Sequence, residues 1–527
     1  MLTITPRKEL IIVLLLIIVA FCLRVYHIGN YGIFSDEKQG ILIAISSTNI
    51  NGDHDIMAID KVFTPQQFWV NKGYEKWADA YARGDTSGNS LFYNLFLKLF
   101  SILFGPYDAS LRMVSVFFNI LTLWVIYKGL KGIFPKSNIA LIALFLATIE
   151  PFFIVFSQQA RSYSMSIFAT TLASFLYWKI VNTPTEKLNR KYYLYYGILV
   201  ITSFFSHYLV FIIFVAHAIY SLLYVRDFGV IKKMILTVLF SIIPFLAWII
   251  YGPGKYASQY KADSLAYYLW HLKTKGEVPG WIEYANFGNL SKRIIEVSSD
   301  LFFFTNDFYD KFGFKIGGIV VFIWLLILLF LFFTTKGTER RFFVFSLLLV
   351  FLPSIFLIYT ALDTNVTTGF FLRYASFGIS FSIFLTAYFI DYIIRSKFVL
   401  KYVLLIFVIV QCGLLFKHIL ALYADKLQKY SYSSGRVKNP YPMIATKIDQ
   451  LYALNDTVVY PSFTNKSFDD RVTGYETKDA QLVNLYLPHN ATYLQKINPF
   501  EPNKVILKKS SGEIIELFNF EGTKYRY

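Results

Sequence analysis

The sequence predicts an all-α membrane protein that crosses the bilayer about eleven times and carries a small α/β or mostly β domain at its C-terminus. Hydrophobic residues make up 55% of the 527 residues, and the mean hydropathy is +0.47. Apolar runs long enough to cross a bilayer recur to residue 422, more than a soluble domain needs. After residue 424 the composition shifts toward Asn, Asp, Lys and Pro.

The first apolar run, residues 10–26, follows a short basic start at Arg7 and Lys8. A small-residue cleavage site does not follow it, so we expect a retained helix with its N-terminus in the cytoplasm rather than a signal peptide. The later spans are expected to centre near residues 120, 144, 170, 199, 215, 242, 324, 351, 384 and 410.

Alternate connections between these spans carry lysine and arginine, as cytoplasmic connections do. The basic residues are Lys128, Lys131, Lys136, Lys179, Lys187, Arg190, Lys191, Arg226, Lys232, Lys233, Lys336, Arg340, Arg341, Arg395, Lys397 and Lys401. The alternation places residues 28–108, 252–313 and 360–373 outside the cytoplasm, together with the tail. Basic loops beside anionic lipid account for much of the net charge of +17, so a nucleic-acid partner is not required.

We therefore divide the chain into a transmembrane domain, residues 1–423, and a C-terminal extracytoplasmic domain, residues 424–527. The first external loop contains the amphipathic run 91–100, which predicts a helix lying in the membrane interface. In the C-terminal domain, alternating runs at 457–460 and 504–507 predict strands. The two cysteines, Cys22 and Cys412, each lie in an apolar span, so we expect neither a disulfide framework nor a thiolate metal site.

Polar residues at the outer ends of the spans form the candidate site. Asp36 and Glu37 follow the first span, in the first external loop. The same outer side carries Arg112, Gln158, Gln159, Arg161, Tyr163, His207, Tyr208, Arg373 and Tyr374. Ionisable groups near bilayer depth are costly and tend to mark function.

These residue types suit group transfer from a lipid phosphate. A carboxylate can take a proton from a hydroxyl, and guanidinium groups suit a bound or leaving phosphate. Simpler interpretations stay open. Asp36 and Glu37 are then a solvated loop pair, and Arg112 and Arg373 extend to lipid headgroups. His207 then caps a tight turn between the spans near 199 and 215.

Several segments resemble, in the same order, the polyprenyl-phosphate-dependent protein mannosyltransferases and aminoarabinose transferases, which are GT-C glycosyltransferases of family 39 and relatives. The similar segments are residues 23–31, 35–37, 109–115, 150–164, 206–208 and 373–374. The resemblance extends over about residues 10–420 and implies the GT-C fold. It also implies inverting transfer of a sugar, a hexose or a pentose, from a polyprenyl-phosphate carrier to an acceptor hydroxyl outside the cytoplasm.

The resemblance further implies roles for the outer residues. Asp36 is the general base on the acceptor hydroxyl, and Glu37 supports it or helps to bind a divalent cation such as Mg²⁺ or Mn²⁺. Arg112 and Arg161 hold the carrier phosphate. The remaining members of the expected substrate-binding set are Tyr163, His207, Arg373 and Lys38.

The sequence departs from the family pattern at three places. Lys38 follows the acidic pair where relatives commonly have a small residue, and its amine can replace part of a cation's role. Residues 88–93 stand where relatives usually carry a His-Pro-Pro-like segment, and Gln159 stands where they often have Glu. These departures bear on metal dependence and on substrate contacts.

The expected partners are a polyprenyl-phosphate-linked sugar, an acceptor that is a protein, lipid or polysaccharide, and membrane lipids. The expected location is the inner (plasma) membrane of a bacterium, with the site facing outward. A lipid-linked sugar flippase or transporter is the alternative, but its charged groups should lie near the bilayer midplane in Gly/Pro-broken helices. A non-catalytic scaffold would not need an outer set of carboxylates and arginines.

Overall fold

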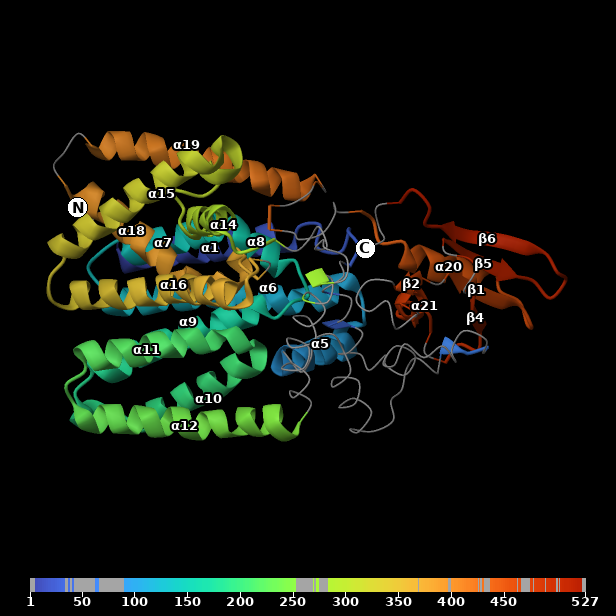
Figure 1. The fold of residues 1–527 in the computed structure, drawn as a ribbon, viewed down its shortest axis with the longest axis horizontal. Coiled ribbons are helices and arrows are strands. Elements are labelled where there is room, and N and C mark those ends of the chain that lie inside the picture. The colour runs from blue at the N-terminus through green and yellow to red at the C-terminus, as the bar shows by residue number, and fades with distance from the viewer. Residues whose placement is uncertain are drawn as a thin grey trace.

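In a computed structural model of the chain, the described residues are 5–33, 37, 40–41, 62–65, 90–252, 269, 272–273, 283–367, 369–396, 400–424, 426, 429–430, 437–461, 463–465, 474–476, 478–488, 490–498, 501 and 503–523. A bundle of helices forms the larger part, and a smaller domain with a β-sheet lies at one end of it (Figure 1). The predicted combination of an α-helical bundle with a small C-terminal sheet domain is therefore confirmed.

Most helices of the bundle occupy the predicted apolar runs, whereas α14 (Phe287–Leu301) lies within the predicted external loop 252–313. Their bounds are α1 (Pro6–Val25), α5 (Leu91–Phe104), α6 (Asp108–Ile133), α7 (Ile139–Ile149), α8 (Pro151–Ser157), α9 (Tyr163–Asn182), η2 (Thr185–Lys187), α10 (Lys191–Ser206), η3 (Tyr208–Val210), α11 (Phe211–Tyr224), α12 (Phe228–Tyr251), α14 (Phe287–Leu301), α15 (Phe308–Thr334), α16 (Gly337–Thr364), α17 (Leu372–Ala375), η4 (Ser376–Gly378), α18 (Ile379–Arg395) and α19 (Leu400–Tyr423). Each predicted span centre lies within one of these helices.

Seven of the described helices are long and apolar enough to cross a membrane: α6, α9, α12, α15, α16, the run from α17 to α18, and α19. An eighth span results if α7 and α8, which bend by 55° at their junction, are taken together. Helix α1 has charged residues at both ends, and α10 and α11 are shorter. The predicted number of about eleven spans therefore stays a prediction.

The centre of the bundle is formed by the helices buried on most sides. In the run containing α18, 83% of the apolar window is buried, whereas in α12 and α19 only 17% is buried. The rim helices present large apolar side chains outward, such as Phe240 and Ile406, as lipid-facing helices do. Near the centre, Gly378 lies against α16, where an added Cβ would come within 2.0 Å of the Leu349 carbonyl oxygen. A side chain at this position would therefore force α16 and η4 apart.

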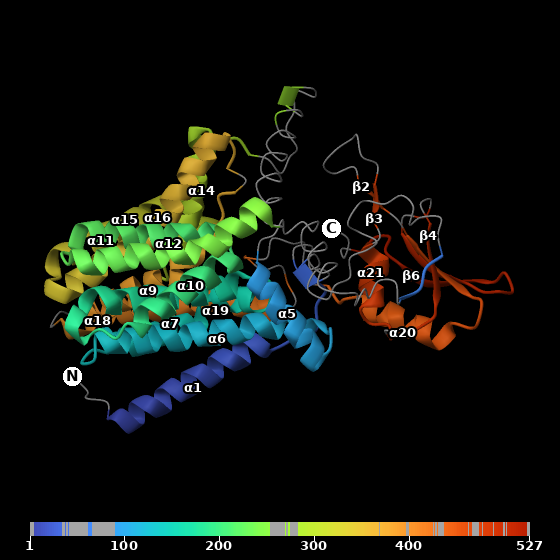
Figure 2. The same cartoon turned by 90° about the horizontal axis from the view of Figure 1, so that it is seen from below.

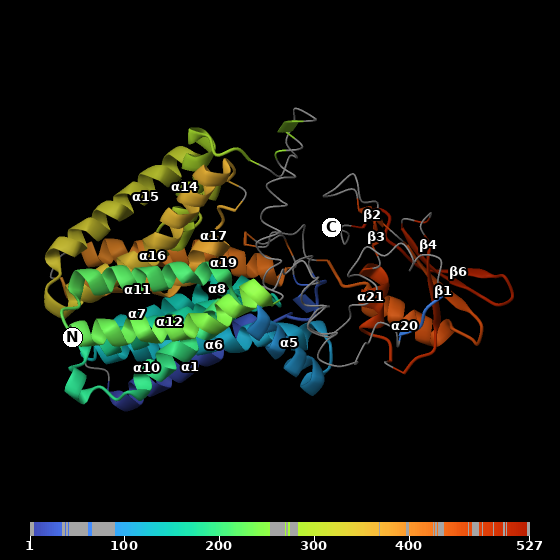
Figure 3. The same ribbon diagram turned by 60° about the horizontal axis from the view of Figure 1, so that its bottom comes forward.

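The two ends of the bundle differ in charge and in what is attached to them. The connections from α11 to α12 and from α15 to α16, which carry basic residues, lie at the end where α1 begins (Figure 1). The C-terminal domain lies at the opposite end, close to α5 (Figures 2 and 3). This is the alternation that the charge pattern predicts, and the assignment of each end to a compartment remains a prediction.

The C-terminal domain packs two helices against a four-stranded sheet. Its elements are α20 (Tyr441–Leu451), β1 (Thr457–Pro461), β2 (Phe463–Asn465), β3 (Gly474–Glu476), α21 (Lys478–Asn484), β4 (Leu494–Asn498), β5 (Lys504–Lys508) and β6 (Ile514–Asn519). The sheet has the order β4-β1-β5-β6, with β1 and β4 parallel and the other pairs antiparallel. Alternate side chains such as Val458, Ile497 and Val505 are buried, because successive side chains of a strand point to opposite faces of the sheet.

Candidate functional site

Arg112 and Glu37 form a buried ion pair near the N-terminal end of α6. Arg112 Nε lies 2.9 Å from Glu37 Oε1, and Arg112 Nη2 lies 3.0 Å from Glu37 Oε2. Both side chains are 1% exposed. Two parallel N–H···O bonds are the geometry in which a guanidinium group binds a carboxylate most strongly. Because Arg112 is buried in this way, it does not extend to the lipid headgroups.

The remaining N–H groups of Arg112 hold the backbone that follows α1. Nη1 donates to the carbonyl oxygens of Ile28 and Tyr31 at 2.9 and 3.0 Å, and Nη2 donates to that of Gly32 at 2.8 Å. Together with the two bonds to Glu37, these bonds use all five N–H donors of a guanidinium group. In this conformation Arg112 organises the start of the first external loop and has no N–H left for a phosphate.

Glu37 also connects the first external loop to the turn between α8 and α9. Its Oε1 atom accepts a hydrogen bond from the backbone N–H of Ala160 at 2.6 Å. The carboxylate is therefore held by α6 on one side and by the residue before Arg161 on the other. Asp36 and Lys38, its neighbours in the sequence, lie outside the described residues.

Four other expected residues come together around a group of aromatic rings. The ring of Tyr163 lies 5.4 Å from that of His207 and 6.4 Å from that of Tyr374, between ring centroids. The guanidinium carbon of Arg161 is 6.0 Å from the Tyr163 ring centroid, and that of Arg373 is 4.8 Å from the Tyr374 ring centroid. Both guanidinium groups lie near enough to act on His207 electrostatically.

His207 has a structural contact within this group. Its Nδ1 atom accepts a hydrogen bond from the backbone N–H of Leu209 at 3.2 Å, which caps η3. The ring of His207 also packs against Phe377, with centroids 5.1 Å apart. The capping role expected as the simpler interpretation is thus present.

Helix α5 connects the helix that carries Arg112 with the turn that carries Arg161. Tyr93 in α5 shares a hydrogen bond of 2.7 Å with Ser115 in α6, and Ser115 Oγ donates to the Arg161 carbonyl oxygen at 3.1 Å. Ser90 Oγ, just before α5, donates to Ser162 Oγ at 2.8 Å. The turn that carries Arg161 is therefore attached both to α6 and to the expected interfacial helix.

Arg24 was not expected at the site, although it is fully buried and close to it. Its Nε donates to Asn119 Oδ1 at 2.6 Å, and its Nη atoms donate to the carbonyl oxygens of Ala147 and Thr148 at 3.0 and 3.1 Å. These carbonyls belong to the last turn of α7, where the helix lacks its own donors. The signal in the sequence was an arginine at the end of an apolar run, together with a second run broken at Pro151.

Gln158 gives a second attachment for the chain that follows α1. Its Nε2 donates to the carbonyl oxygens of Arg24 and Tyr26 at 3.1 and 3.0 Å. The Tyr31 hydroxyl donates to the Gln158 carbonyl oxygen at 2.5 Å. The backbone leading to the acidic pair is thus held by α6 and by the α8–α9 turn together.

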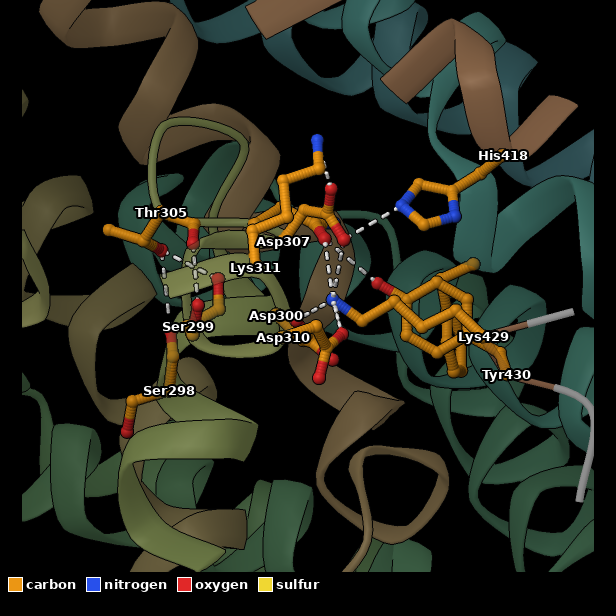
Figure 4. Close-up of polar contacts among 12 residues, drawn as sticks. Ser298, Ser299, Asp300, Thr305, Asp307, Asp310, Lys311, His418, Lys429 and Tyr430 are labelled. Carbon is orange, nitrogen blue, oxygen red and sulfur yellow. Dashed lines mark hydrogen bonds and ion pairs between the residues drawn. The ribbon is translucent and has the colours of Figure 1, made fainter. Parts of the chain in front are cut away.

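A second buried cluster surrounds Lys429, after α19 (Figure 4). Lys429 Nζ lies 2.6 Å from Asp300 Oδ1, 2.7 Å from Asp310 Oδ2 and 3.8 Å from Asp307 Oδ1. On the other side of Asp307, His418 Nε2 lies 2.9 Å from Oδ1, and Lys311 Nζ lies 2.6 Å from Oδ2. This cluster was not predicted from the sequence, because its two parts, residues 300–311 and 418–429, lie more than a hundred residues apart.

The surroundings of Asp300 and Asp307 shift the pKa values of these two carboxyl groups in opposite directions. Burial raises the pKa of Asp300 to about 6, although Lys429 opposes part of this effect. Burial also acts to raise the pKa of Asp307, but hydrogen bonds from His418 and Lys311 outweigh it and hold the pKa at about 2. Each carboxylate thus has a cationic partner, and the cluster fixes the segment that leads from α19 to the C-terminal domain.

Among the described residues, His, Cys, Asp and Glu side chains do not form a group of three or more that could hold a metal ion. Both carboxylate oxygens of Glu37 are engaged, and the positive charge of Arg112 lies next to them. The described part of the expected cation site therefore does not fit a divalent ion.

Comparison with known proteins gives one match to a family and several to solved structures. Residues 89–251 match the family model of dolichyl-phosphate-mannose-protein mannosyltransferases. A search of curated proteins gives no match. Similar solved structures include the oligosaccharyltransferase AglB from Archaeoglobus fulgidus in complex with an inhibitory peptide and a dolichol-phosphate, which is 14% identical with a TM-score of 0.46. They also include ArnT from Cupriavidus metallidurans bound to undecaprenyl phosphate, which is 9% identical with a TM-score of 0.39.

The chain is shorter than its archaeal neighbour. The alignment covers 94% of this chain and 65% of the AglB chain, and 94% of this chain and 86% of the ArnT chain. The matched segment 89–251 contains Arg112, Arg161, Tyr163 and His207. The match confirms the resemblance that the sequence motifs indicated: over this segment the chain is similar to the dolichyl-phosphate-mannose-protein mannosyltransferases, a family of glycosyltransferases.

Proposed function

We propose that the protein is an inverting glycosyltransferase that moves a sugar from a polyprenyl-phosphate carrier to an acceptor hydroxyl on the extracytoplasmic side of the membrane. The observation that carries the proposal is the convergence of the described site residues at one end of the bundle. Glu37, Arg112 and the α8–α9 turn are joined by hydrogen bonds, and Arg161 lies in that turn. Most of these residues belong to the segment that matches the mannosyltransferase family model.

In this proposal Asp36 is the general base. Glu37 is unsuited to that role, because Arg112 and the Ala160 N–H engage its oxygens. A carboxylate fixed in this way instead holds the adjacent residue in a defined place, which a base needs in order to reach the acceptor hydroxyl. Asp36 takes the hydroxyl proton as the acceptor oxygen attacks the sugar C1. One in-line displacement inverts that carbon, and a second protein nucleophile is not required.

The leaving carrier phosphate is assigned to Arg161 and Arg373. The bond between C1 and the phosphate oxygen breaks as the acceptor bond forms, so negative charge grows on the phosphate. Guanidinium groups stabilise such charge through paired N–H donors. Tyr163 lies near Arg161 and next to His207, on which both arginines act, so the two side chains would line the phosphate and sugar positions. Arg112, whose five donors are already engaged, is assigned a positioning role instead of phosphate binding.

The donor and the setting follow from the same family match. The description of the matched family names dolichyl-phosphate-mannose. We therefore propose a polyprenyl-phosphate-linked hexose or pentose as the donor. The acceptor is a protein, lipid or polysaccharide outside the plasma membrane. Lys38, next to Glu37 in the sequence, supplies a cationic amine beside the acidic pair, and no step is assigned to a metal ion.

The proposal is tested with the purified full-length protein in detergent. A panel of undecaprenyl- and dolichyl-phosphate-linked monosaccharides is supplied together with extracted envelope material as acceptor, and release of the free carrier phosphate is measured. We expect Asp36→Asn to lower turnover by about a hundredfold, because a general base is removed. Asp85→Asn, a matched change in the same external loop, should leave turnover near the wild-type value.

The alternative of a lipid-linked sugar flippase gives the opposite result in a reconstituted system. A flippase moves the intact lipid-linked sugar between leaflets of a liposome without releasing the carrier phosphate. Movement without release by the wild-type protein, unaffected by Asp36→Asn, would therefore refute the transferase proposal.

A further inference from the structure

The C-terminal domain contacts α6 one helical turn before Arg112. The carboxylate of Asp108, which is 6% exposed, accepts a hydrogen bond from the Tyr486 hydroxyl and another from Asn439 Nδ2 at 2.8 Å. Asn439 Nδ2 also lies 2.9 Å from the Tyr486 hydroxyl oxygen. Asp108 and Arg112 are four residues apart and so lie on the same face of the helix. The domain is thus bonded to the helix turn that positions Glu37.

The C-terminal segment also reaches the first external loop just before the acidic pair. The Gly32 N–H donates to the Val437 carbonyl oxygen at 2.7 Å, while the Gly32 carbonyl oxygen accepts from Arg112 at 2.8 Å. Gly32 is therefore held between α6 and Val437, which lies shortly before α20. Glu37 follows it by five residues.

A third contact lies beyond the acidic pair. Phe63 and Gln495 exchange two backbone hydrogen bonds of 2.8 Å each, which form an antiparallel bridge at the edge of β4. The short segment 62–65, blue in Figure 1, lies beside β4 and extends the sheet. Phe63 is 5% exposed and packs in one apolar cluster with side chains of the C-terminal domain such as Ile497.

The three contacts lie on both sides of Glu37 along the chain. Gly32 precedes Glu37, Phe63 follows it, and both are bonded to C-terminal residues, while Asp108 bonds the same domain to the helix of Arg112. A loop whose two ends are fixed has fewer conformations than one fixed at a single end. An attachment that served only to tether the domain would not need to bind the loop on both sides of its acidic residues.

We propose that the C-terminal domain is a positioning element of the site: through Tyr486 and Asn439 on Asp108, Val437 on Gly32 and Gln495 on Phe63, it fixes the described backbone before and after Glu37. The catalytic consequence of this role rests on the proposed transferase function, whereas the mechanical coupling does not. Asp108, Asn439 and Tyr486 are positioning residues, since they act on the loop through Arg112 and the backbone.

The test compares two tyrosines of the C-terminal domain in the full-length protein. Tyr486→Phe removes the hydroxyl that donates to Asp108 and keeps the ring. Tyr493→Phe is the matched control, because its hydroxyl donates to Asp449 within the domain. Hydrogen–deuterium exchange is measured in peptides covering residues 28–41, and kcat and KM are measured with the lipid-linked sugar that the wild-type protein consumes.

We expect Tyr486→Phe to speed exchange in residues 28–41 about fivefold, the effect of losing one buried hydrogen bond on local opening. It should lower kcat several-fold with KM for the donor unchanged, since positioning of the base is impaired and donor binding is not. Tyr493→Phe should change neither. Unchanged exchange in Tyr486→Phe, or equal changes in both variants, would overturn the coupling. A wild-type protein that consumes no lipid-linked sugar would refute the transferase proposal alone, because the exchange result stands without it.

A disulfide gives a second and independent measurement. Residues that exchange both backbone hydrogen bonds in an antiparallel pair have Cα atoms about 5.5 Å apart, within disulfide range. Phe63→Cys with Gln495→Cys, in a chain with Cys22→Ala and Cys412→Ala, should form this bond. The oxidised protein should retain turnover, and the bond should restore part of the turnover lost in Tyr486→Phe. Loss of turnover on oxidation, with recovery on reduction, would show that the loop must leave the domain and would overturn the proposal.

Discussion

The guanidinium group of Arg112 binds the carboxylate of Glu37 through two parallel hydrogen bonds, and neither side chain is more than 1% exposed. Burying two charges costs hydration energy, which offsets much of their attraction, so a buried pair fixes the positions of its residues as much as it stabilises the fold. Here the geometry connects three parts of the chain: α6, the backbone after α1, and the α8–α9 turn through Ala160. The pair therefore acts as the junction around which the proposed site is built.

Removing one charge of this pair should destabilise the protein. Glu37→Gln leaves Arg112 buried without the carboxylate that it binds through two hydrogen bonds, and breaking a buried pair in this way costs about 3–5 kcal/mol. We expect a clearly lower unfolding midpoint in detergent and a strong loss of turnover. Glu186→Gln, at an exposed position in η2, is the control and should have no effect. An unfolding midpoint for Glu37→Gln equal to that of the control would contradict the junction role.

Arg161 should determine affinity for the carrier. Arg161→Gln removes one of the two guanidinium groups assigned to the phosphate, so we expect binding of undecaprenyl phosphate to weaken by about tenfold. The measurement is a titration of the purified protein with undecaprenyl phosphate in detergent. Arg190→Gln, at an exposed site before α10, should bind as the wild type does. Equal affinity of Arg161→Gln and Arg190→Gln would exclude Arg161 as a phosphate ligand.

Much of the bundle could be predicted from the sequence, because the apolar runs are long and each predicted span centre lies in a helix. The number of crossings could not be settled in the same way. Helix α1 has charged ends, α10 and α11 are short, and α7 and α8 are bent by 55°. Length and hydropathy do not decide whether such helices cross, because a charged end can be bonded inside the bundle, as Arg24 of α1 is.

The sequence named several residues that the structure brings together, but it could not show which contacts each of them makes. Residue types and their order along the chain indicated Glu37, Arg112 and Arg161. They could not show that all five N–H groups of Arg112 are used within the protein. The contact of Asp108 with the C-terminal domain was not predicted either, because its partners Asn439 and Tyr486 lie more than three hundred residues away in the sequence. Contacts of that kind depend on the fold and leave no local pattern.

Arg24 should be essential for the break between α7 and α8. Arg24→Leu removes the donors for the Ala147 and Thr148 carbonyl oxygens and for Asn119 Oδ1. Buried acceptors left without donors cost about 1–3 kcal/mol each. We expect a lower unfolding midpoint and faster hydrogen exchange at the end of α7. Arg7→Leu, at the exposed start of α1, is the control, and an equal effect of both changes would argue against the capping role.

Lys429 should make stability depend on pH through Asp300. The pKa of Asp300 is raised to about 6, so the folded state favours its protonated form, and the cost of ionising this buried group grows as pH rises from about 4 to about 6. In the wild type, Lys429 offsets part of that cost. In Lys429→Met this compensation is lost, so the variant should lose more stability at pH 8 than at pH 5, by about 2 kcal/mol. Unfolding midpoints in detergent at the two pH values measure the difference.

The matched control for this prediction is Lys508→Met, at an exposed position in β5. It removes the same charge and should shift the midpoint little at either pH. Asp307 works in the opposite sense, because its pKa of about 2 makes it stabilising above pH 4, and this contribution is lost as pH falls toward 2. Lys429 also interacts electrostatically with Glu150 and Glu296. The expected pH effect of Lys429→Met in the range from 5 to 8 therefore comes from the buried carboxyl groups around Lys429, of which Asp300 is the one bonded to it. A loss of stability that is equal at pH 5 and pH 8 would show that Lys429 contributes packing without neutralising Asp300.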